Sequence, residues 1–201
     1  MAEPSIPASS RALVLGSTSP YRRELLSRLR VKFDVESPRV DETALPGETP
    51  ARTAVRLALA KARAVAARHP SAVVIGSDQV ADLDGRALGK PGTHDNAVAQ
   101  LKLMSGQTVV FHTAVAVVCL ETGFEQQELA PITVTFRRLG DDEIEAYLLA
   151  EQPYDCAGSA RSEGLGIAIL ESIESDDPSA LVGLPLIRTC RMIRAAGVKV
   201  L

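Results

Sequence analysis

The sequence predicts an α/β fold in which helices flank a mixed, twisted sheet. Short apolar runs typical of buried strands alternate with capped amphipathic helices along most of the chain. The dipeptide Asp84-Gly85 is a strong hairpin signal and places an antiparallel pair in the middle of the sheet. The 46% hydrophobic content is enough for a core, and the 3% aromatic content means that this core is aliphatic. We expect residues 11–201 to form one domain and residues 1–10 to be a disordered N-terminal lead.

The first part of the chain is predicted to contain three strands and two helices. Ser19 is a favoured N-cap and Pro20 a favoured first helical residue. Thr49 and Pro50 repeat this pattern at the start of a longer helix. The run at residues 72–76 is apolar throughout, as expected for a strand covered on both faces. The predicted order is strand 12–16, helix 20–30, strand 33–36, helix 50–68 and strand 72–76.

The second part is predicted to begin with the hairpin at residues 80–88. Lys90-Pro91-Gly92 then interrupts the chain, and Thr93 can cap the next helix. Two strands follow, joined through Thr122-Gly123, before the chain returns to helix. The predicted order is helix 93–104, strands 108–120 and 132–137, helix 141–151 and a final amphipathic helix 183–196.

Charge and composition exclude several classes of protein. The net charge of −3 over 201 residues argues against general nucleic-acid binding, which usually requires a basic surplus. Residues 1–10 lack the basic and apolar regions of a secretory signal, and the most apolar stretch, 114–120, is too short to cross a membrane. Three widely spaced cysteines suit a reducing compartment. We therefore expect a cytoplasmic protein that binds neither nucleic acid nor membranes.

Two arginines stand where local structure does not favour them. Arg22 and Arg23 fall in the first turn of a predicted helix, where a cation opposes the helix dipole at a cost of roughly 0.3–1 kcal/mol each. An anion bound at the same helix end would reverse the sign of that effect. Free backbone N–H groups, the hydroxyls of Ser17 and Ser19 and a guanidinium together could cradle a phosphate. The alternative is that both arginines lie in solvent.

Lys61 and Asp78 are charged residues at positions that should be apolar. The helix from residue 50 carries one apolar stripe, and Lys61 falls on it, so it must either reach solvent or meet an anion in a cleft. Asp78 follows the buried run 72–76, where open α/β sheets bind their ligands, and a carboxylate there needs a partner or a metal. A capping role is the alternative for Asp78, but no turn residue follows it.

Other familiar motifs are absent. Residues 85–91 imitate a phosphate-binding loop, but the glycine spacing is one residue short and Pro91 replaces the Ser or Thr that would hold the metal. Lys90 could still reach a phosphate from a hairpin loop. The three histidines have no ligand spacing and no serine has a GxSxG setting, so the sequence does not indicate a catalytic triad.

The chain resembles the Maf family of nucleotide pyrophosphatases. The matching segments occur in the same order from about residue 12 to 196, and it is the ordered set that is specific. They are LVLGSTSPYRR at 13–23, VDE at 40–42, KA at 61–62, IGSDQ at 75–79, GKP at 89–91, LMSG at 103–106, AGSARSEG at 157–164 and LVGLP at 181–185.

This resemblance implies an elongated fold with two lobes around a cleft, similar to the inosine-triphosphate pyrophosphatases. It implies hydrolysis of a nucleoside triphosphate to a monophosphate and diphosphate, a divalent metal cofactor (Mg²⁺ or Mn²⁺) and a homodimer as a frequent assembly. Asp78 matches the family's proton acceptor. Ser17, Arg22, Lys61 and Lys90 match polar cleft positions suited to phosphate, and Glu42 is expected to share a metal with Asp78. Whether Asp78 acts as base, metal ligand or both stays open.

Base specificity within the family is expected to follow Tyr21, Gln79 and Glu163. Members that cleave dTTP and UTP have Arg, Thr and Gln there, so this chain resembles the branch that acts on 7-methyl-GTP. Methylation at N7 makes guanine cationic, which suits stacking on Tyr21 and a carboxylate at Glu163. The alternatives are a dTTP/UTP pyrophosphatase of the same family, a non-catalytic nucleotide-binding regulator of cell division, or an unrelated phosphate-binding protein.

Overall fold

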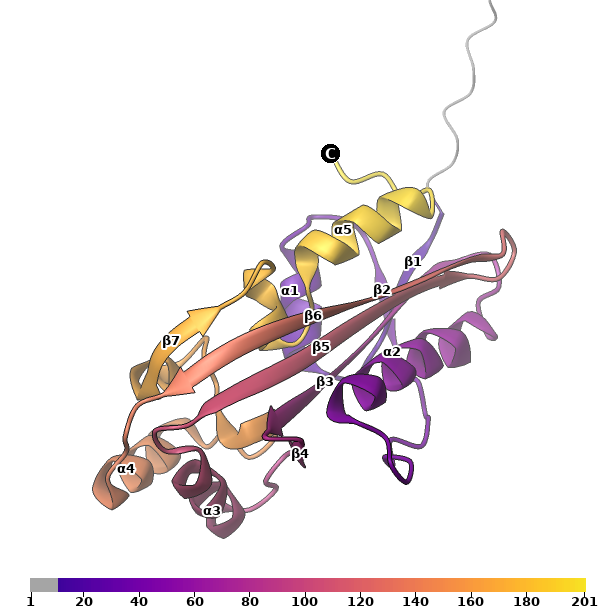
Figure 1. The fold of residues 1–201 in the computed structure, drawn as a ribbon. Helices are drawn as coiled ribbons and strands as arrows, with labels where there is room; N and C mark the ends of the chain where they lie inside the picture. Colours follow the sequence, from indigo (N-terminus) through magenta and orange to yellow (C-terminus); the bar gives the residue numbers. More distant parts are fainter. Residues whose placement is uncertain (1–10) are drawn as a thin grey trace, which may run out of the picture.

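The computed structural model describes residues 11–201, and one seven-stranded mixed sheet runs through them (Figure 1). The strand order is β2-β1-β3-β5-β6-β7, with β4 paired to β3. The strands β2, β1 and β3 are mutually parallel, and all other pairs are antiparallel. The predicted mixed α/β architecture is therefore confirmed. The prediction for residues 1–10 lies outside the described residues.

Helices and strands follow the predicted order closely. The strands are β1 (Leu13–Gly16), β2 (Asp34–Glu36), β3 (Val73–Leu83), β4 (Arg86–Leu88), β5 (Thr108–Cys119), β6 (Phe124–Phe136) and β7 (Leu170–Glu174). The helices are α1 (Pro20–Ser27), α2 (Pro50–Ala66), α3 (His94–Met104), α4 (Asp141–Glu151) and α5 (Leu186–Ala195), with 3-10 turns η1 (Ala157–Ser159), η2 (Leu165–Ile169) and η3 (Pro178–Val182).

The predicted helix caps are confirmed. The side chains of Ser19, Thr49 and Thr93 each accept the backbone N–H three residues later, as N-cap residues do. The first helix ends at Ser27 rather than Arg30, because Arg30 takes a left-handed conformation (φ 53°) that a helix cannot include.

Two strand predictions were wrong in extent, and one strand was missed. The run 72–76 continues without a break to Leu83, so Asp78 lies inside β3 and not beyond its end. Strand β6 begins at Phe124 instead of residue 132. Its first half exposes polar side chains, so the apolar pattern did not reveal it, and pairing with β5 holds it in the sheet. Strand β7 was not predicted, because it is short and mostly exposed. The last helix starts at Leu186, with η3 before it.

The apolar core lies in separate clusters along the long central strands. One cluster packs α3 and α4 against the far ends of β3, β5 and β6. The other two cover the two faces of the sheet at its parallel end, with α1 and α5 on one face and α2 on the other. Helix α2 approaches β3 so closely at Gly76 that a Cβ there would lie 2.2 Å from the Ala58 carbonyl oxygen. This contact places the α2 side chains directly over the middle of β3.

A gap in the sheet creates space beside the middle of β3. Strand β1 pairs with β3 only as far as Gly76, and β4 begins its pairing at Ala81. Residues 77–80 of β3 therefore have a neighbouring strand on the β5 side only. Because parallel β1 ends here, the prediction that Asp78 lies near the carboxyl edge of the parallel strands is still correct in spatial terms.

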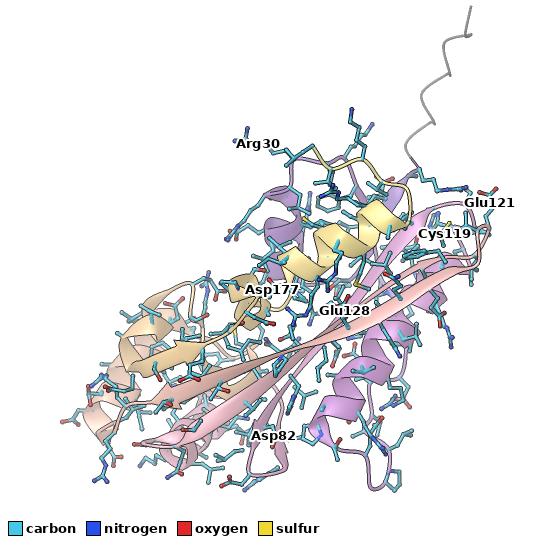
Figure 2. All side chains as sticks on the ribbon, turned by 45° about the horizontal axis from the view of Figure 1, so that its top comes forward. Arg30, Asp82, Cys119, Glu121, Glu128 and Asp177 are labelled. Carbon is cyan, nitrogen blue, oxygen red and sulfur yellow. The ribbon has the colours of Figure 1, made fainter. Side chains whose placement is uncertain are left out.

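A buried aspartate holds the segment between β7 and α5 over this gap. Asp177 is fully buried and accepts the backbone N–H groups of Ile187 and Arg188 (Figure 2). The Arg188 guanidinium lies 3.6 Å from Asp177 and 3.7 Å from Glu128 of β6. The same segment receives hydrogen bonds from β3, because Ser77 donates to the Gly183 carbonyl and Gln79 to the Ala180 carbonyl. Residues 180–183 thereby form a fixed wall of the gap.

Among residues 11–201, no helix combines the length and the apolar character that crossing a membrane requires.

Candidate active site

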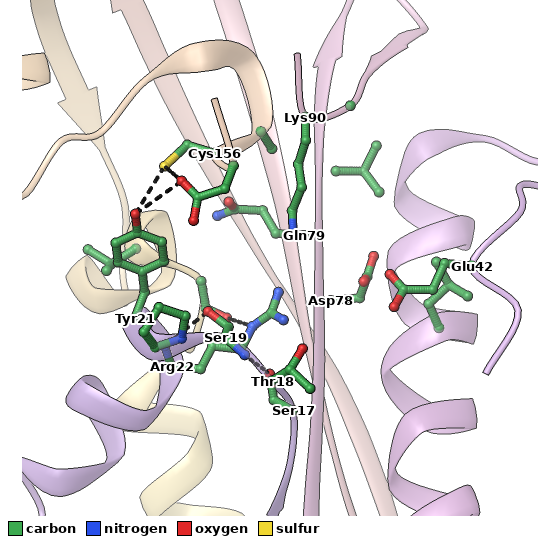
Figure 3. A pocket seen from close by; sticks show the side chains of 18 of the residues that line it. Ser17, Thr18, Ser19, Tyr21, Arg22, Glu42, Asp78, Gln79, Lys90 and Cys156 are labelled. Atoms are coloured by element: carbon green, nitrogen blue, oxygen red, sulfur yellow. Dashed lines mark hydrogen bonds between the residues drawn. The ribbon is translucent and has the colours of Figure 1, made fainter. Parts of the chain in front are cut away.

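The gap beside β3 opens into a polar cleft of about 490 Å³. That size is within the range of small-molecule binding sites. Asp78 and Glu42 lie on one side of the cleft, Tyr21 and Cys156 on the other, and Lys90 reaches in from the loop after β4 (Figure 3). All of the predicted site residues line this one cleft: Ser17, Tyr21, Arg22, Glu42, Lys61, Asp78, Gln79, Lys90 and Glu163.

Lys61 joins two carboxylates at the deep side of the cleft. Its Nζ lies 2.7 Å from Asp78 Oδ1 and 2.8 Å from Glu42 Oε2. The side chains of Lys61 and Asp78 are almost fully buried, whereas Glu42 comes from an exposed loop. The apolar stripe of α2 thus directs Lys61 inward as predicted, and the lysine meets anions instead of reaching solvent.

The surroundings of Asp78 raise its pKa above the ordinary aspartate value. Burial is the largest cause, and the neighbouring Glu42 charge acts in the same direction. The charges of Lys61 and Arg22 and the hydrogen bond from Lys61 oppose this rise. A carboxylate with a raised pKa in a cleft is a better proton acceptor than an ordinary exposed aspartate.

Arg22 and Ser17 present unused donors at the start of α1. Arg22 Nε donates to the Gly183 carbonyl at 2.8 Å, which fixes the guanidinium against the wall of the cleft. Ser17 is buried, and its Oγ accepts the Ser19 N–H at 3.1 Å. Within residues 11–201 the Ser17 hydroxyl proton has no acceptor. Both groups can therefore donate to a phosphate bound at this helix end.

The two arginines of the first helical turn differ in their placement. Arg22 lines the cleft, whereas Arg23 is exposed and lies away from it. Burial lowers the pKa of the Arg22 guanidinium, and the charges of Asp78 and Glu42 partly offset this. Lys90 is exposed and points into the cleft (Figure 3), and it makes no ion pair with the described residues. Arg22, Lys61 and Lys90 together supply three cations to the cleft.

The three residues expected to recognise the base do lie in the cleft, with different degrees of freedom. Tyr21 donates its hydroxyl to Asp155 Oδ1 at 3.2 Å. The Gln79 side-chain nitrogen lies within 2.8–3.0 Å of the Thr113 hydroxyl and the carbonyls of Ala180 and Leu181. Gln79 therefore has its amide oxygen left to accept a hydrogen from a ligand. Glu163 is partly exposed and pairs with Arg161 at 3.5 Å.

Two charged residues beside Tyr21, Asp155 and Arg161, showed no sign of a role in the sequence. Asp155 lines the cleft beside Cys156, and Arg161 lies over the Tyr21 ring with its Cζ 5.4 Å from the ring centroid. Arg161 belongs to the AGSARSEG segment, so the motif marked the loop but not the contact. Burial raises the pKa of the Cys156 thiol to about 12, which is typical of a structural and not of a reactive cysteine.

The carboxylates suit a hard divalent cation. Asp78 and Glu42 face the same Lys61 Nζ, and each has one oxygen without a hydrogen-bond partner among the described residues. No group of three or more His, Cys, Asp or Glu side chains in residues 11–201 forms a complete metal cage. Mg²⁺ and Mn²⁺ are commonly held by one or two carboxylates together with substrate phosphates, so two carboxylates beside a phosphate site fit such an ion.

The geometry defines a class of site. A buried carboxylate with a raised pKa, three cations, a free hydroxyl and an aromatic side chain surround one cleft. Such a set can bind a polyphosphate, compensate its charge and accept a proton from water.

The chain belongs to the family of Maf-like proteins, whose family model matches residues 12–196. A relative from Polaromonas sp., named 7-methyl-GTP pyrophosphatase, is 75% identical over 190 residues, covering 94% of this chain and 87% of the relative. One from Albidiferax ferrireducens with the same name is 71% identical and covers 95% and 96% of the two chains. Among solved structures, a HAM1 protein from Coxiella burnetii matches with a TM-score of 0.47 and 16% identity, over 89% of this chain and 98% of that one.

Proposed function

We propose that this protein hydrolyses the anhydride between the α and β phosphates of a nucleoside triphosphate, with 7-methyl-GTP as preferred substrate. The products are 7-methyl-GMP and diphosphate. The observation that carries the proposal is the buried contact of Lys61 with Asp78 and Glu42, opposite Arg22 in one cleft. The printed names of the close relatives support the choice of substrate.

Asp78 is proposed as the proton acceptor for the attacking water. The water oxygen bonds to the α phosphorus, its proton passes to Asp78, and the bond from that phosphorus to the bridging oxygen breaks. Arg22, Lys61 and Lys90 hold the phosphates and offset negative charge on the leaving diphosphate, and Ser17 donates its hydroxyl hydrogen. A divalent cation held by Asp78 and Glu42 would supply further positive charge.

The preference for a methylated base rests on charge at the opposite end of the cleft. Asp155 and Glu163 line this end of the cleft, and Glu151 lies outside it in an ion pair with the guanidinium of Arg161. A guanine methylated at N7 carries a positive charge, which this region attracts and which an aromatic ring such as Tyr21 also favours. Uracil, thymine and unmodified guanine lack that charge and gain less.

The cofactor, the cellular location and the assembly are further parts of the proposal. We propose Mg²⁺ or Mn²⁺ as the cofactor, the cytoplasm as the location and a homodimer as the assembly. The first is supported by the oxygen donors of Asp78 and Glu42, the second by three free cysteines and the third by family resemblance. Light scattering coupled to gel filtration measures the assembly directly.

The test is diphosphate release from 7-methyl-GTP, GTP, UTP and dTTP, with each metal, for the unchanged protein and Asp78→Asn. We expect selective cleavage of 7-methyl-GTP, and a loss of about 10²–10⁴-fold in rate on substitution. Arg63→Met is a matched control for folding, because it removes an exposed ion pair with Glu125 outside the cleft.

Two other outcomes would contradict the proposal. Cleavage of UTP and dTTP alone would keep the reaction and overturn the assigned base. Tight nucleotide binding without turnover would instead identify a binding protein, such as a regulator.

A further inference from the structure

Arg161 contacts both of the charged or aromatic groups expected to recognise the base. Its guanidinium lies over the Tyr21 ring at 5.4 Å and its Nε lies 3.5 Å from Glu163 Oε1. Tyr21 and Glu163 line the cleft, whereas Arg161 does not line it. The Arg161 guanidinium therefore already makes the cation–π contact with Tyr21 and the charge contact with Glu163 that a cationic base would also make.

The position of Arg161 is fixed from outside the cleft. Arg161 Nη1 donates to Glu151 Oε1 at 2.8 Å, and the other Glu151 oxygen accepts the Leu165 N–H at 2.7 Å. The backbone N–H of Arg161 donates to the Tyr147 hydroxyl at 3.0 Å. Gly164 leaves room for Glu151, since a Cβ there would come within 2.6 Å of its carboxylate. Residues 161–165 are thus wrapped around one carboxylate, and Arg161 cannot leave without breaking that arrangement.

The contacts of Arg161 with the base site are weaker than those with Glu151. The Arg161 Nε is buried without a hydrogen-bond partner among the described residues, so the approach to Glu163 is an ion pair only. A cation over the Tyr21 ring draws on the same π electrons that would attract a cationic base. It also neutralises part of the Glu163 charge. Both effects act against a positively charged base and hardly affect a neutral one.

We propose that Arg161 sets the degree of selectivity between 7-methylguanine and unmodified guanine, by competing with the cationic ring for Tyr21 and Glu163. This inference rests on the proposed function and names a residue that limits its base preference. Arg161 holds the loop in place through its ion pair with Glu151. Because the same guanidinium lies beside Tyr21 and Glu163, it also weakens the attraction of these two residues for the methylated base.

The test is the affinity for 7-methyl-GMP and for GMP, measured by calorimetry, because these monophosphates contain no anhydride that hydrolysis could consume. In Arg161→Met we expect roughly fivefold tighter binding of 7-methyl-GMP, with GMP unchanged within about twofold. Arg161→Lys keeps the charge and should leave the ratio of the two affinities close to that of the unchanged protein. Arg63→Met removes an equal charge far from the cleft and should leave both affinities unchanged.

If Arg161→Met does not fold, as judged by its thermal unfolding, Arg161→Gln removes the same charge and keeps a hydrogen-bond donor for Glu151. An unchanged ratio in the folded neutral variant, or an equal weakening of both monophosphates, would overturn the inference and leave Arg161 as a loop anchor.

The inference and the proposed function can fail separately. Normal hydrolysis of 7-methyl-GTP with an unchanged ratio in Arg161→Met overturns the inference alone. The expected change in ratio in a protein that hydrolyses no nucleotide supports the inference and overturns the enzymatic proposal. If the unchanged protein neither binds 7-methyl-GMP nor hydrolyses 7-methyl-GTP, both are overturned.

Discussion

The two ends of the cleft hold charges in different ways. At the end proposed to bind phosphates, here called the phosphate end, the side chains of Lys61 and Asp78 are 5% and 8% exposed, and they meet in a hydrogen-bonded ion pair. At the base end Arg161 and Glu163 are 37% and 24% exposed and lie 3.5 Å apart without a hydrogen bond. Electrostatic interactions are stronger where water is excluded. The phosphate end therefore suits large effects on the reaction rate, and the base end suits modest effects on selectivity.

The largest effect is expected from Lys61→Met, which tests the phosphate end. It removes a cation from the phosphate site and leaves buried Asp78 without its nearest partner. Steady-state kinetics should show kcat falling by about 10²–10³-fold for every nucleotide, with the ratio between 7-methyl-GTP and GTP preserved. A change confined to KM would mean that Lys61 only binds the ground state.

Two glycines allow each end to be disturbed separately. In Gly76→Ala the new methyl group would meet the backbone of α2 at Ala58 and Ala62, at 2.2 and 2.5 Å. In Gly166→Ala it would meet the Arg161 carbonyl oxygen at 2.4 Å. We expect each to lower the free energy of unfolding by about 1–3 kcal/mol, measured in urea.

Their effects on function should differ. Gly76→Ala moves α2, and Lys61 with it, so kcat should fall for all substrates. Gly166→Ala displaces the loop that carries Glu163, so the selectivity for 7-methyl-GTP should change with less effect on kcat. If both variants changed kcat and the selectivity for 7-methyl-GTP to the same extent, the two ends of the cleft would not be independent.

The pH dependence follows from the raised pKa of Asp78. Because the ionised form must accept the proton, kcat/KM should rise with pH along a limb that lies above the usual aspartate pKa of about 3.9. Lys61 lowers the pKa of Asp78, so the limb should move to higher pH in Lys61→Met.

Stability should depend on pH in the opposite sense. A carboxyl whose pKa is raised by folding stabilises the folded state below its unfolded pKa, and this contribution is lost as the pH rises through the folded value. Unfolding in urea at several pH values, compared between the unchanged protein and Asp78→Asn, isolates the contribution. A pH limb at the ordinary aspartate position would contradict the role given to Asp78.

The sequence predicted the phosphate end better than the base end, for a physical reason. Lys61 and Asp78 break local patterns, because one falls on an apolar helix stripe and the other directly follows a buried apolar run. Each could therefore be noticed in the sequence without knowledge of its partner. Arg22 was visible because it opposes a helix dipole. Extended pairing was less visible: β3 continues past Gly76 because Ser77, Asp78 and Gln79 pair with β5, a contact that no local pattern encodes.

The base end depends on contacts between distant segments. Arg161 and Tyr21 are separated by most of the chain, and neither breaks a local pattern. The positions of Tyr21, Gln79 and Glu163 were expected only from the family resemblance. Glu151 is the last residue of α4, where a carboxylate opposes the helix dipole, and this was the only sign of it in the sequence. Only the fold shows that residues 161–165 wrap around it.

The smallest effect is expected from Glu163→Gln, which tests the open end directly. The substitution keeps the shape and removes a charge that Arg161 already neutralises in part, so selectivity for 7-methyl-GTP over GTP should fall by roughly two- to fivefold. In combination with Arg161→Met, the effect of Glu163→Gln should become larger, because the carboxylate is then no longer paired. Competition assays with both nucleotides in one reaction measure these ratios. If the two substitutions are additive, Arg161 and Glu163 act on the base independently, and the pairing between them has no part in selectivity.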